Sequence, residues 1–412
     1  MVRSKDDITA GDGAKHDIMQ GKAAIANQTT VNVFNLLKEC GIPLAFIQGL
    51  DETSFLARNC RMIPLEVVVR REAHGSYLKR NPHLEKGHIF PQLICEFFLK
   101  TSGKEWYGRA IPEDDPLIVW GNNREANLYL PKKPMWEQKS FMTVDPAEIF
   151  SEDELNSEDI FNEDPQGIER MTHIAKATFF VLEKAWQILG RRLVDFKVEF
   201  GIDHNGNLVL ADVIDNDSWR VIEDGEYIDK QFYRDGGALD EVTAKYAHVR
   251  DLTGLFGIPH QQLILWRASD KDNFGPLKEA FVEYGSLEEC QITEITRSLH
   301  KEPVRAYLDL AKAVRNVPDS VLIALVGRSN GAGPTLSAQT SIPVITVPAT
   351  GKDFPEDLWS SLRTPSETPV ATIMEPANAI LQALQILALR NPLLYSRLRI
   401  KQERRLMNIA AL

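Results

Sequence analysis

Acidic and basic side chains alternate along one short segment, residues 193–201, which reads LVDFKVEFG. Because side chains along a strand point alternately to its two faces, Asp195, Lys197 and Glu199 would share one face, and valine and phenylalanine the other. Carboxylates and a lysine on one face can hold a metal ion or meet an anionic substrate. We therefore expect this face to belong to a functional site.

The segment continues into a turn whose Asn205-Gly206 pair is typical of a two-residue hairpin loop. With that loop, Glu199 lies directly opposite Asp212, and like charges placed opposite each other destabilise a hairpin. A divalent cation would compensate, and Mg²⁺ favours one or two carboxylates together with phosphate oxygens. The alternative is a solvated polar face with a slightly repulsive pair. The strongly apolar opposite face favours the functional interpretation.

A basic segment, residues 67–80, runs from an apolar strand into a turn with glycine and serine. Its Arg70, Ser76, Lys79 and Arg80 could hold phosphate or carboxylate groups. Basic strand ends are common, so this segment alone is weak evidence. Together with a turn-rich polar segment near the start of the chain and the paired carboxylates, it indicates phosphate chemistry.

A glycine-rich loop follows an apolar strand in residues 321–334, VLIALVGRSNGAGP. Gly327, Gly331 and Gly333 permit the backbone to approach an anion closely. A lone glycine loop is weak evidence, but the sequence SLHK at 298–301 follows the preceding strand. Ligands of parallel sheets bind beyond the carboxyl ends of the strands, so we expect the two loops to converge there.

Strands and helices alternate in the second part of the chain, which predicts a parallel, doubly wound sheet. The first part mixes the two and predicts an α+β domain. We place the first domain at residues 1–235, a linker at 236–258 and the second domain at 259–412. The predicted strands are 62–69, 193–201, 208–215, 262–266, 290–296, 320–326 and 342–347, and the predicted helices include 168–189, 274–284 and 303–315.

Composition argues against several classes of protein. A net charge of −11 over 412 residues argues against general nucleic-acid binding, which needs clustered lysine and arginine. The longest apolar stretch, near 377–389, contains two glutamines and is too short to span a bilayer. Four scattered cysteines without a Cys-x-x-Cys pair, and no signal peptide at the start, fit a reducing compartment. We therefore expect a cytosolic protein that binds neither nucleic acid nor membranes.

The segments SKDDITAGDGAK, GKAAIAN, MIPLEVVVRR, GSYLKRNP, DFKVEFG and ADVIDNDSWR resemble those of SAICAR synthetases. SLHK and VGRSNGAGP resemble the AIR carboxylase domain fused to them in animals. The resemblance implies an ATP-grasp-like α+β domain followed by a flavodoxin-like domain, in a bifunctional enzyme of purine biosynthesis. The carboxylase would add CO₂ to aminoimidazole ribotide without a cofactor. The synthetase would join the product to L-aspartate with ATP and Mg²⁺, through an acyl phosphate.

The resemblance also implies roles for residues of the first half. Glu199 and Asp212 would bind the metal, and the strand with Pro64, Glu66 and Val67 would present its backbone to adenine. The residues expected to hold the ribotide or to lie in the same substrate-side motifs are Arg70, Ser76, Asp195, Lys197, Asp217, Arg220 and Arg234.

In the second half the resemblance makes His300 the acid and base, because carboxylation requires a proton to leave the ring carbon and histidine suits that transfer. Lys301 would hold the phosphate or the new carboxylate, and Ser329 and Asn330 would line the CO₂ pocket. The family also implies a homo-octamer whose core is the second domain.

The chain departs from the family at two places. Family members begin with a hairpin whose Lys-x-x-x-Gly-Lys-Thr-Lys-like loop covers the ATP phosphates. No Gly-Lys-Thr-Lys occurs here, so we expect either that the gene sequence as given is truncated or that the protein has lost this cover. The family also carries Gly-Ser-x-Ser-Asp at the end of the first parallel strand, where this chain has Trp266-Arg267-Ala268-Ser269-Asp270.

Tryptophan at the glycine position would be strained if that position takes a positive φ. Arg267 could still hold phosphate by charge, and Ser269 and Asp270 would keep the ribose contacts. The two departures leave a second interpretation open, a degenerate paralogue that retains the fold and the oligomer contacts but has lost one or both activities.

Overall fold

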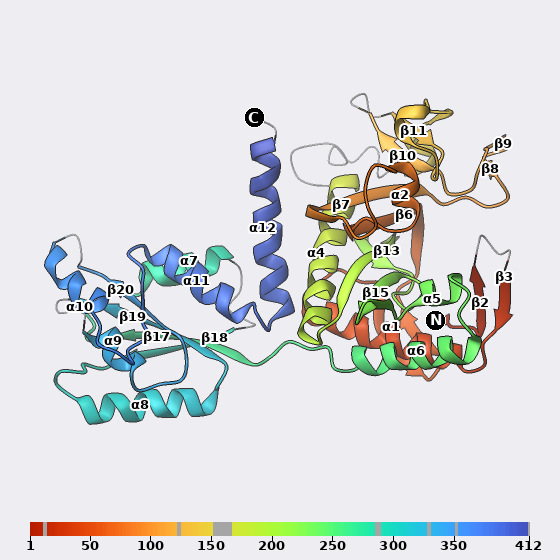
Figure 1. Ribbon diagram of the computed structural model, residues 1–412. Helices are drawn as coiled ribbons and strands as arrows, with labels where there is room; N and C mark the ends of the chain where they lie inside the picture. The colour runs from red at the N-terminus through yellow and green to blue at the C-terminus, as the bar shows by residue number, and fades with distance from the viewer. Residues whose placement is uncertain are drawn as a thin grey trace. The chain divides into compact units, whose positions relative to one another are not determined.

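Two compact units make up the chain in the computed structural model, which describes residues 1–10, 15–121, 125–150, 167–284, 290–327, 331–350 and 353–410. Unit 1 comprises residues 1–257 and 403–412, and unit 2 comprises residues 258–402. Figure 1 draws most of unit 1 in red to green and unit 2 in cyan to blue.

The residues predicted to form a linker, 236–258, group almost entirely with unit 1. Most of them form helix α6 (Leu239–Thr253), which packs along α1 (Lys22–Glu39). Val242, Tyr246 and Val249 are fully buried. These residues recur at helical spacing and form one apolar stripe, a pattern that the linker prediction overlooked.

The last residues, 403–412, also group with unit 1, although the sequence analysis placed them in the second domain. The buried carboxylate of Glu403, near the end of α12 (Pro392–Ala410), accepts a hydrogen bond from the backbone N–H of Leu93 at 2.8 Å. It also pairs with Lys176 at 2.9 Å. A buried carboxylate requires such partners, and they attach the end of the chain to unit 1.

An antiparallel sheet forms the centre of unit 1, in the order β12-β11-β10-β7-β6-β13-β15-β16, with β14 paired to β13. Its long strands are β6 (Cys60–Glu72), β7 (Ile89–Leu99) and β13 (Arg192–Asp203). Helix α4 (Gly167–Ile188) packs on the apolar face, where the rings of Phe179 and Phe196 meet edge to face at 5.5 Å. The other strands are β10 (Leu117–Trp120), β11 (Ala126–Tyr129), β12 (Met142–Val144), β14 (Leu208–Ala211), β15 (Trp219–Glu223) and β16 (Glu226–Tyr227).

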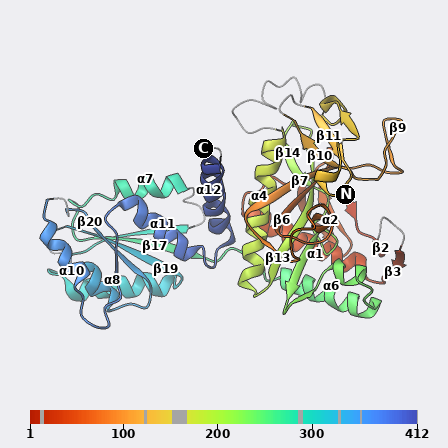
Figure 2. The same ribbon diagram turned by 45° about the horizontal axis from the view of Figure 1, so that its top comes forward.

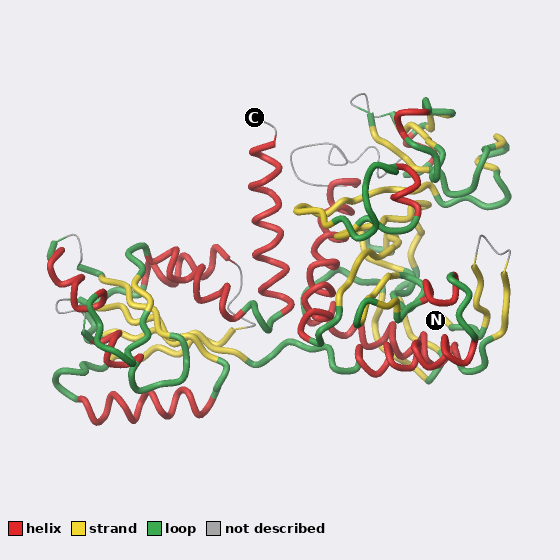
Figure 3. Tube along the Cα trace, in the orientation of Figure 1, coloured by secondary structure: helices red, strands yellow, loops and turns green. Residues whose placement is uncertain are grey.

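Shorter elements complete unit 1, as Figure 3 shows by colour. Strands β1 (Val2–Arg3), β5 (Ser54–Ala57) and β4 (Phe46–Asp51) form a three-stranded sheet, and β2 (Asp7–Ala10) pairs with β3 (Lys15–Ile18) and β8 (Glu105–Trp106) with β9 (Arg109–Ala110). The short helices are α2 (Ser76–Arg80), α5 (Lys230–Arg234) and the 3₁₀ turns η1 (Met135–Glu137) and η2 (Pro146–Glu148).

Unit 2 is a parallel, doubly wound sheet in the order β18-β17-β19-β20-β21. In chain order this is 2-1-3-4-5, the flavodoxin-like arrangement, so the predicted fold class is confirmed. Helices α7 and α11 share one apolar core with the sheet, while α8 and α9 share the core on the opposite face (Figures 1 and 2). The bounds are β17 (Gln261–Arg267), α7 (Gly275–Tyr284), β18 (Cys290–Thr296), α8 (Pro303–Asn316), β19 (Ser320–Val326), α9 (Ala332–Ser337), β20 (Val344–Pro348), η3 (Pro355–Leu358), α10 (Trp359–Leu362), β21 (Ala371–Thr372) and α11 (Pro376–Leu387).

Gly333, which the sequence analysis assigned to anion binding, has a packing role in the structure. It lies in α9, which packs on β20, and a Cβ at this position would come within 1.6 Å of Oγ1 of Thr346. The residue is buried. Glycine is therefore required here because the helix and the strand approach each other closely.

Within the described parts of the chain, no helix has both the length and the apolar character needed to cross a membrane.

Candidate active site

Asp195 on β13 lies opposite two arginines, because β13 is flanked by β6 on one side and β15 on the other. The register pairs it with Arg70 of β6 and with Arg220 of β15. Both guanidinium groups donate to the same oxygen, Asp195 Oδ2, at 2.6 Å. Asp195 and Arg70 are each only 3% exposed, so these charge-assisted bonds are shielded from water. One carboxylate thus holds two of the predicted substrate-binding arginines.

Gly75 leaves the space that Arg220 occupies. A Cβ at Gly75 would lie 2.4 Å from Nη2 of Arg220, and the φ of +58° suits glycine. Ser76 follows as the first residue of α2. Gln231 Oε1 accepts hydrogen bonds from Arg220 at 3.2 Å and from Arg234 at 3.5 Å. The structure therefore brings together Arg70, Ser76, Asp195, Arg220 and Arg234.

The hairpin loop after β13 is one residue longer than predicted. Asp203 and Asn207 close it with a backbone bond, and Gly206 has a φ of +80°. The carboxylate of Asp203 accepts hydrogen bonds from the N–H groups of Asn205 and Asn207. A glycine in the left-handed region and a capping aspartate favour a three-residue loop.

The longer loop shifts the register, so the predicted direct pairing of Glu199 with Asp212 is wrong. Glu199 lies opposite Ala211, and Asp212 follows β14 with a φ of +63°. The two acids are still neighbours that share a hydrogen bond. Burial raises the pKa of Asp212, and the charge of Glu199 raises it further. Asp212 therefore keeps a proton more readily than an ordinary aspartate.

Lys197 balances the negative charge on this face. The register places Glu66 of β6 directly opposite Glu199, an arrangement of like charges that destabilises a sheet. Lys197 Nζ lies 3.1 Å from Glu66 and 2.8 Å from Glu199, and Lys100 Nζ lies 2.5 Å from the other oxygen of Glu199. Burial alone lowers the pKa of Lys197, but the two carboxylates outweigh it and raise that pKa. Burial tends to raise the pKa of Glu199, yet the two lysines lower it overall.

Glu199 and Asp212 together fit a divalent cation. They offer only oxygen donors, and Mg²⁺ in proteins typically takes one or two carboxylates together with phosphate oxygens and water. A cation bound between them would favour the charged form of Asp212. Among the described residues, no group of three or more His, Cys, Asp or Glu could hold a metal.

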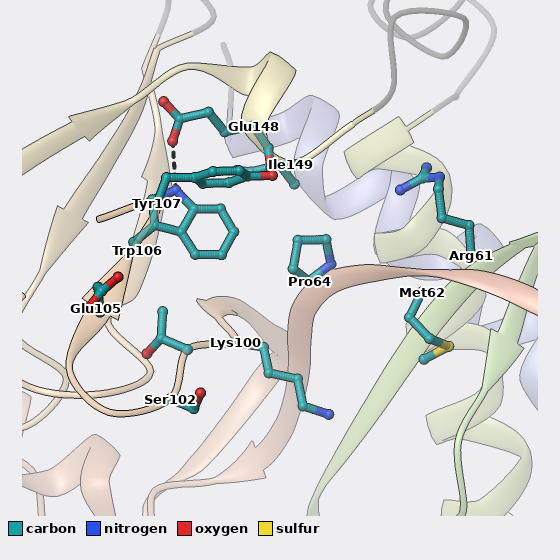
Figure 4. Close-up of a pocket in the computed structure, with 11 residues that line it drawn as sticks. Arg61, Met62, Pro64, Lys100, Ser102, Glu105, Trp106, Tyr107, Glu148 and Ile149 are labelled. Atoms are coloured by element: carbon teal, nitrogen blue, oxygen red, sulfur yellow. Dashed lines mark hydrogen bonds between the residues drawn. The ribbon is translucent and has the colours of Figure 1, made fainter. Parts of the chain in front are cut away.

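A cavity of about 580 Å³ is linked to this acidic pair by Lys100, which lines the cavity and bonds Glu199. Figure 4 shows Trp106 and Tyr107 on one wall, with the indole N–H of Trp106 donating to Glu148 at 2.6 Å. The opposite wall carries the start of β6. The labelled residues of the lining are Arg61, Met62, Pro64, Lys100, Ser102, Glu105, Trp106, Tyr107, Glu148 and Ile149.

The backbone predicted to face adenine is only partly accessible. Met62 and Pro64 line the cavity. Glu66 and Val67 pair with β7 on one side and β13 on the other, so the sheet uses their backbone donors and acceptors. Pro64 has no N–H, and its carbonyl already accepts a hydrogen bond from the N–H of Lys100 at 2.9 Å.

Asp217 lies in a second cluster, which the sequence analysis missed. Its carboxylate accepts a hydrogen bond from Tyr246 Oη at 2.8 Å and lies 3.0 Å from Lys230 and 3.4 Å from Lys22. Burial tends to raise the pKa of Asp217, but Lys22 and Lys230 lower it overall. The partners come from α1, α5 and α6, so no local spacing in the sequence signals them.

The residues predicted in the second half emerge at one edge of the parallel sheet. Arg267 ends β17, Gly327 follows β19, and the turn with His300 and Lys301 follows β18. Both His300 and Lys301 are exposed. A Cβ at Gly327 would lie 3.2 Å from Oδ1 of Asp272, so the loops after β17 and β19 meet.

Ser269 and Asp270 are exposed in the loop after β17, while Ser329 and Asn330 lie outside the described residues. A cavity of about 440 Å³ opens at this edge of the sheet. It is lined by Lys271, Asp272, Asn273, Pro276, Leu277, Leu325, Val347, Pro348, Ala349, Thr350, Met374, Glu375 and Pro376.

Trp266 shows none of the strain that the sequence analysis expected. It is a regular residue of β17 without a positive φ, and it is 1% exposed in the core under α8 and α9. Its indole N–H donates to the carbonyl of Arg297 at 3.1 Å. The side chain points into the core, where a bulky apolar group is accommodated.

Arg267 is engaged within its own loop. Its guanidinium group donates to Thr296 at 2.8 Å, to the carbonyl of Asp272 at 3.0 Å and to Asp270 at 2.6 Å. It also lies 4.8 Å from the ring of Phe274. The side chain of Arg267 thus stabilises the loop that follows β17.

These features define an α/β protein with two ligand-binding units. Unit 1 combines paired carboxylates, fixed guanidinium groups and a cavity, as expected of an enzyme for anionic substrates, and unit 2 is a doubly wound domain with its loops at the ligand-binding edge.

Comparison with known proteins agrees with this division. The SAICAR synthetase family model matches residues 1–115 and 140–251, and the AIR carboxylase model matches residues 269–407. The chain is 33% identical to the probable multifunctional protein ADE2 of Caenorhabditis elegans, over 99% of the chain and 90% of that protein. It is 34% identical to the human bifunctional phosphoribosylaminoimidazole carboxylase/phosphoribosylaminoimidazole succinocarboxamide synthetase, over 97% of the chain and 88% of that protein. A solved SAICAR synthetase in complex with ADP is 29% identical, with a TM-score of 0.46 over 61% of the chain and 88% of that protein.

The chain therefore belongs to the family of bifunctional proteins that join a SAICAR synthetase to an AIR carboxylase.

Replacing Trp266 by alanine should destabilise unit 2. Truncating a buried tryptophan costs roughly 3–5 kcal/mol through lost burial and a cavity, whereas Trp359→Ala, at a side chain that is 53% exposed, should cost less than about 1 kcal/mol. Thermal or urea unfolding of both variants measures the difference. Equal stability of the two would show that Trp266 does not belong to the core.

Proposed function

We propose that this chain catalyses two successive steps of purine biosynthesis, the CO₂-dependent carboxylation of aminoimidazole ribotide in unit 2 and the ATP-dependent ligation of the product to L-aspartate in unit 1. The matches to both family models and to bifunctional relatives over nearly the whole chain support this proposal.

In unit 1 the carboxylated ribotide binds to the guanidinium groups of Arg70 and Arg220, which Asp195 holds side by side. Ser76 and Arg234 complete this anionic subsite. Lys197, which stays charged between Glu66 and Glu199, attracts the carboxylate that is to be activated. The observation that carries this assignment is the contact of buried Arg70 and partly buried Arg220 with one carboxylate oxygen, because arginines held in this way are fixed before any ligand arrives.

ATP occupies the cavity lined by Trp106, Tyr107 and Pro64, and Lys100 connects that cavity with Glu199. Glu199 and Asp212 would hold Mg²⁺, which would neutralise phosphate charge during transfer. Asp217, with Lys22 and Lys230, lies in the same substrate-side motif.

Replacing Glu199 by glutamine should lower ligation activity by about 100-fold and raise the Mg²⁺ concentration needed, because a charged ligand of the ion is lost. Glu226→Gln removes an exposed carboxylate on the same unit and should leave both quantities unchanged. Formation of the succinocarboxamide is measured as a function of Mg²⁺. An unchanged Mg²⁺ dependence in Glu199→Gln would contradict the metal assignment.

In unit 2, His300 removes the ring proton, Lys301 holds an anionic group of the substrate, and Ser329 and Asn330 line the CO₂ pocket. Ser269, Asp270 and the loop glycines Gly327 and Gly331 bind the ribose and phosphate. The common edge at which β17, β18 and β19 end supports this assignment.

Replacing His300 by asparagine should reduce CO₂-dependent carboxylation by about 100-fold, the usual contribution of a general acid or base, and should not change ligation. A ¹³CO₂ or bicarbonate incorporation assay measures the first step alone. Full carboxylation by His300→Asn would exclude this residue as the acid and base. Absence of carboxylation by the unmodified protein would contradict the proposal for unit 2.

We also propose that the protein is cytosolic, in keeping with four cysteines that form no disulfide, and that unit 2 assembles it into a homo-octamer.

A further inference from the structure

Arg80 was expected to face an anionic ligand, but the structure buries it. Its side chain is 1% exposed, and its Nη1 donates to the backbone carbonyl of Pro131 at 2.6 Å. Its Nη2 donates to Oε1 of Glu96, on β7, at 2.5 Å. Pro131 belongs to residues 116–139, the segment that the SAICAR synthetase family model leaves unmatched between its two matched ranges.

Glu96 also binds one of the proposed substrate-binding arginines, Arg70. Its second oxygen, Oε2, accepts a hydrogen bond from Nε of Arg70 at 2.9 Å, and Arg70 donates through Nη1 to Asp195. Asp195 in turn holds Arg220. A continuous series of charge-assisted bonds therefore runs from the carbonyl of Pro131 to the arginines of the proposed ribotide subsite.

Positive and negative side chains alternate along this series, so each one stabilises its neighbours. Three guanidinium groups alternate with two carboxylates, so these five side chains carry a net charge of +1, which favours the binding of an anionic ligand. Glu96 is 11% exposed and Arg70 4% exposed at the side chain, and removing one partner of a buried pair leaves the other uncompensated. Glu96 is thus the group that fixes Nε of Arg70.

The unmatched segment is anchored to the same strand. Its strand β10 pairs with β7 through Leu117 with Phe98 and Ile118 with Phe97, next to Glu96. Arg80 lies over the ring of Phe98 at 5.4 Å. The segment therefore contacts both ends of the Arg80–Glu96 pair, through the carbonyl of Pro131 and through the strand that carries Glu96.

We propose that residues 116–121 and 125–139 act as a positioning element for ribotide binding, and that Arg80 and Glu96 transmit this effect by fixing the guanidinium group of Arg70. The inference rests on the proposed synthetase function of unit 1. Arg80 and Glu96 are positioning residues, because they act through Arg70.

The test is the Glu96→Gln variant, which keeps the shape of the side chain but removes its charge. The KM for the carboxylated ribotide should rise about tenfold, as expected for weakened charge-assisted bonds. kcat and the KM for ATP should stay within about twofold, because the interaction serves ribotide binding alone. Calorimetric titration with the same ribotide should show the same tenfold loss of affinity. A merely structural role would leave both ribotide measurements unchanged in the folded variant.

Arg80→Met is the second variant, since methionine fills part of the buried space without donating to Pro131 or Glu96, and it should weaken ribotide binding in the same way. Glu113→Gln is the matched control, because it breaks a more exposed ion pair with Lys132 of the same segment and should change nothing. Unchanged ribotide affinity in folded Glu96→Gln overturns the inference. Failure of the unmodified protein to bind the ribotide contradicts the proposed function instead.

Discussion

The contact of Asp195 with two arginines is the constraint on which the site in unit 1 depends. It exists because β13 is central and its register sets Asp195 opposite Arg70 on one neighbour and Arg220 on the other. A slip of one residue would turn every side chain of β13 to the other face, removing Phe196 from its contact with α4. The packing of the apolar face therefore fixes the geometry of the charged face.

The same register also places two carboxylates opposite each other further along β13, together with the lysine that compensates their charge. Glu66 and Glu199 face each other, and Lys197 lies between them. The pKa of Glu199 is lowered and that of Asp212 is raised, so the environment moves the pKa values of these two neighbouring acids apart. Environments that shift the pKa values of neighbouring acids in opposite directions are common at functional sites, which agrees with the proposed role of this pair.

The alternation of LVDFKVEFG was enough to predict the strand, its two faces and the acids on one of them. The pairing of Glu199 could not be predicted, because the choice between a two- and a three-residue loop depends on the side chain of Asp203 capping the turn. Arg80 resembles a ligand-binding arginine in the sequence. Only the tertiary structure shows that its guanidinium group donates to the carbonyl of Pro131 and to Glu96 instead. In unit 2, alternating strands and helices predicted the doubly wound sheet, but the inward direction of Trp266 and the packing of Gly333 on Thr346 depend on contacts between elements.

The central claim is that Asp195 holds Arg70 and Arg220 in place for an anionic substrate. Calorimetric titration of the carboxylated ribotide into the unmodified protein and into Asp195→Asn tests it most directly, since asparagine preserves the shape but not the charge. The account predicts at least about tenfold weaker binding in the variant, with ATP binding unchanged. Equal ribotide affinity of the two folded proteins would contradict it.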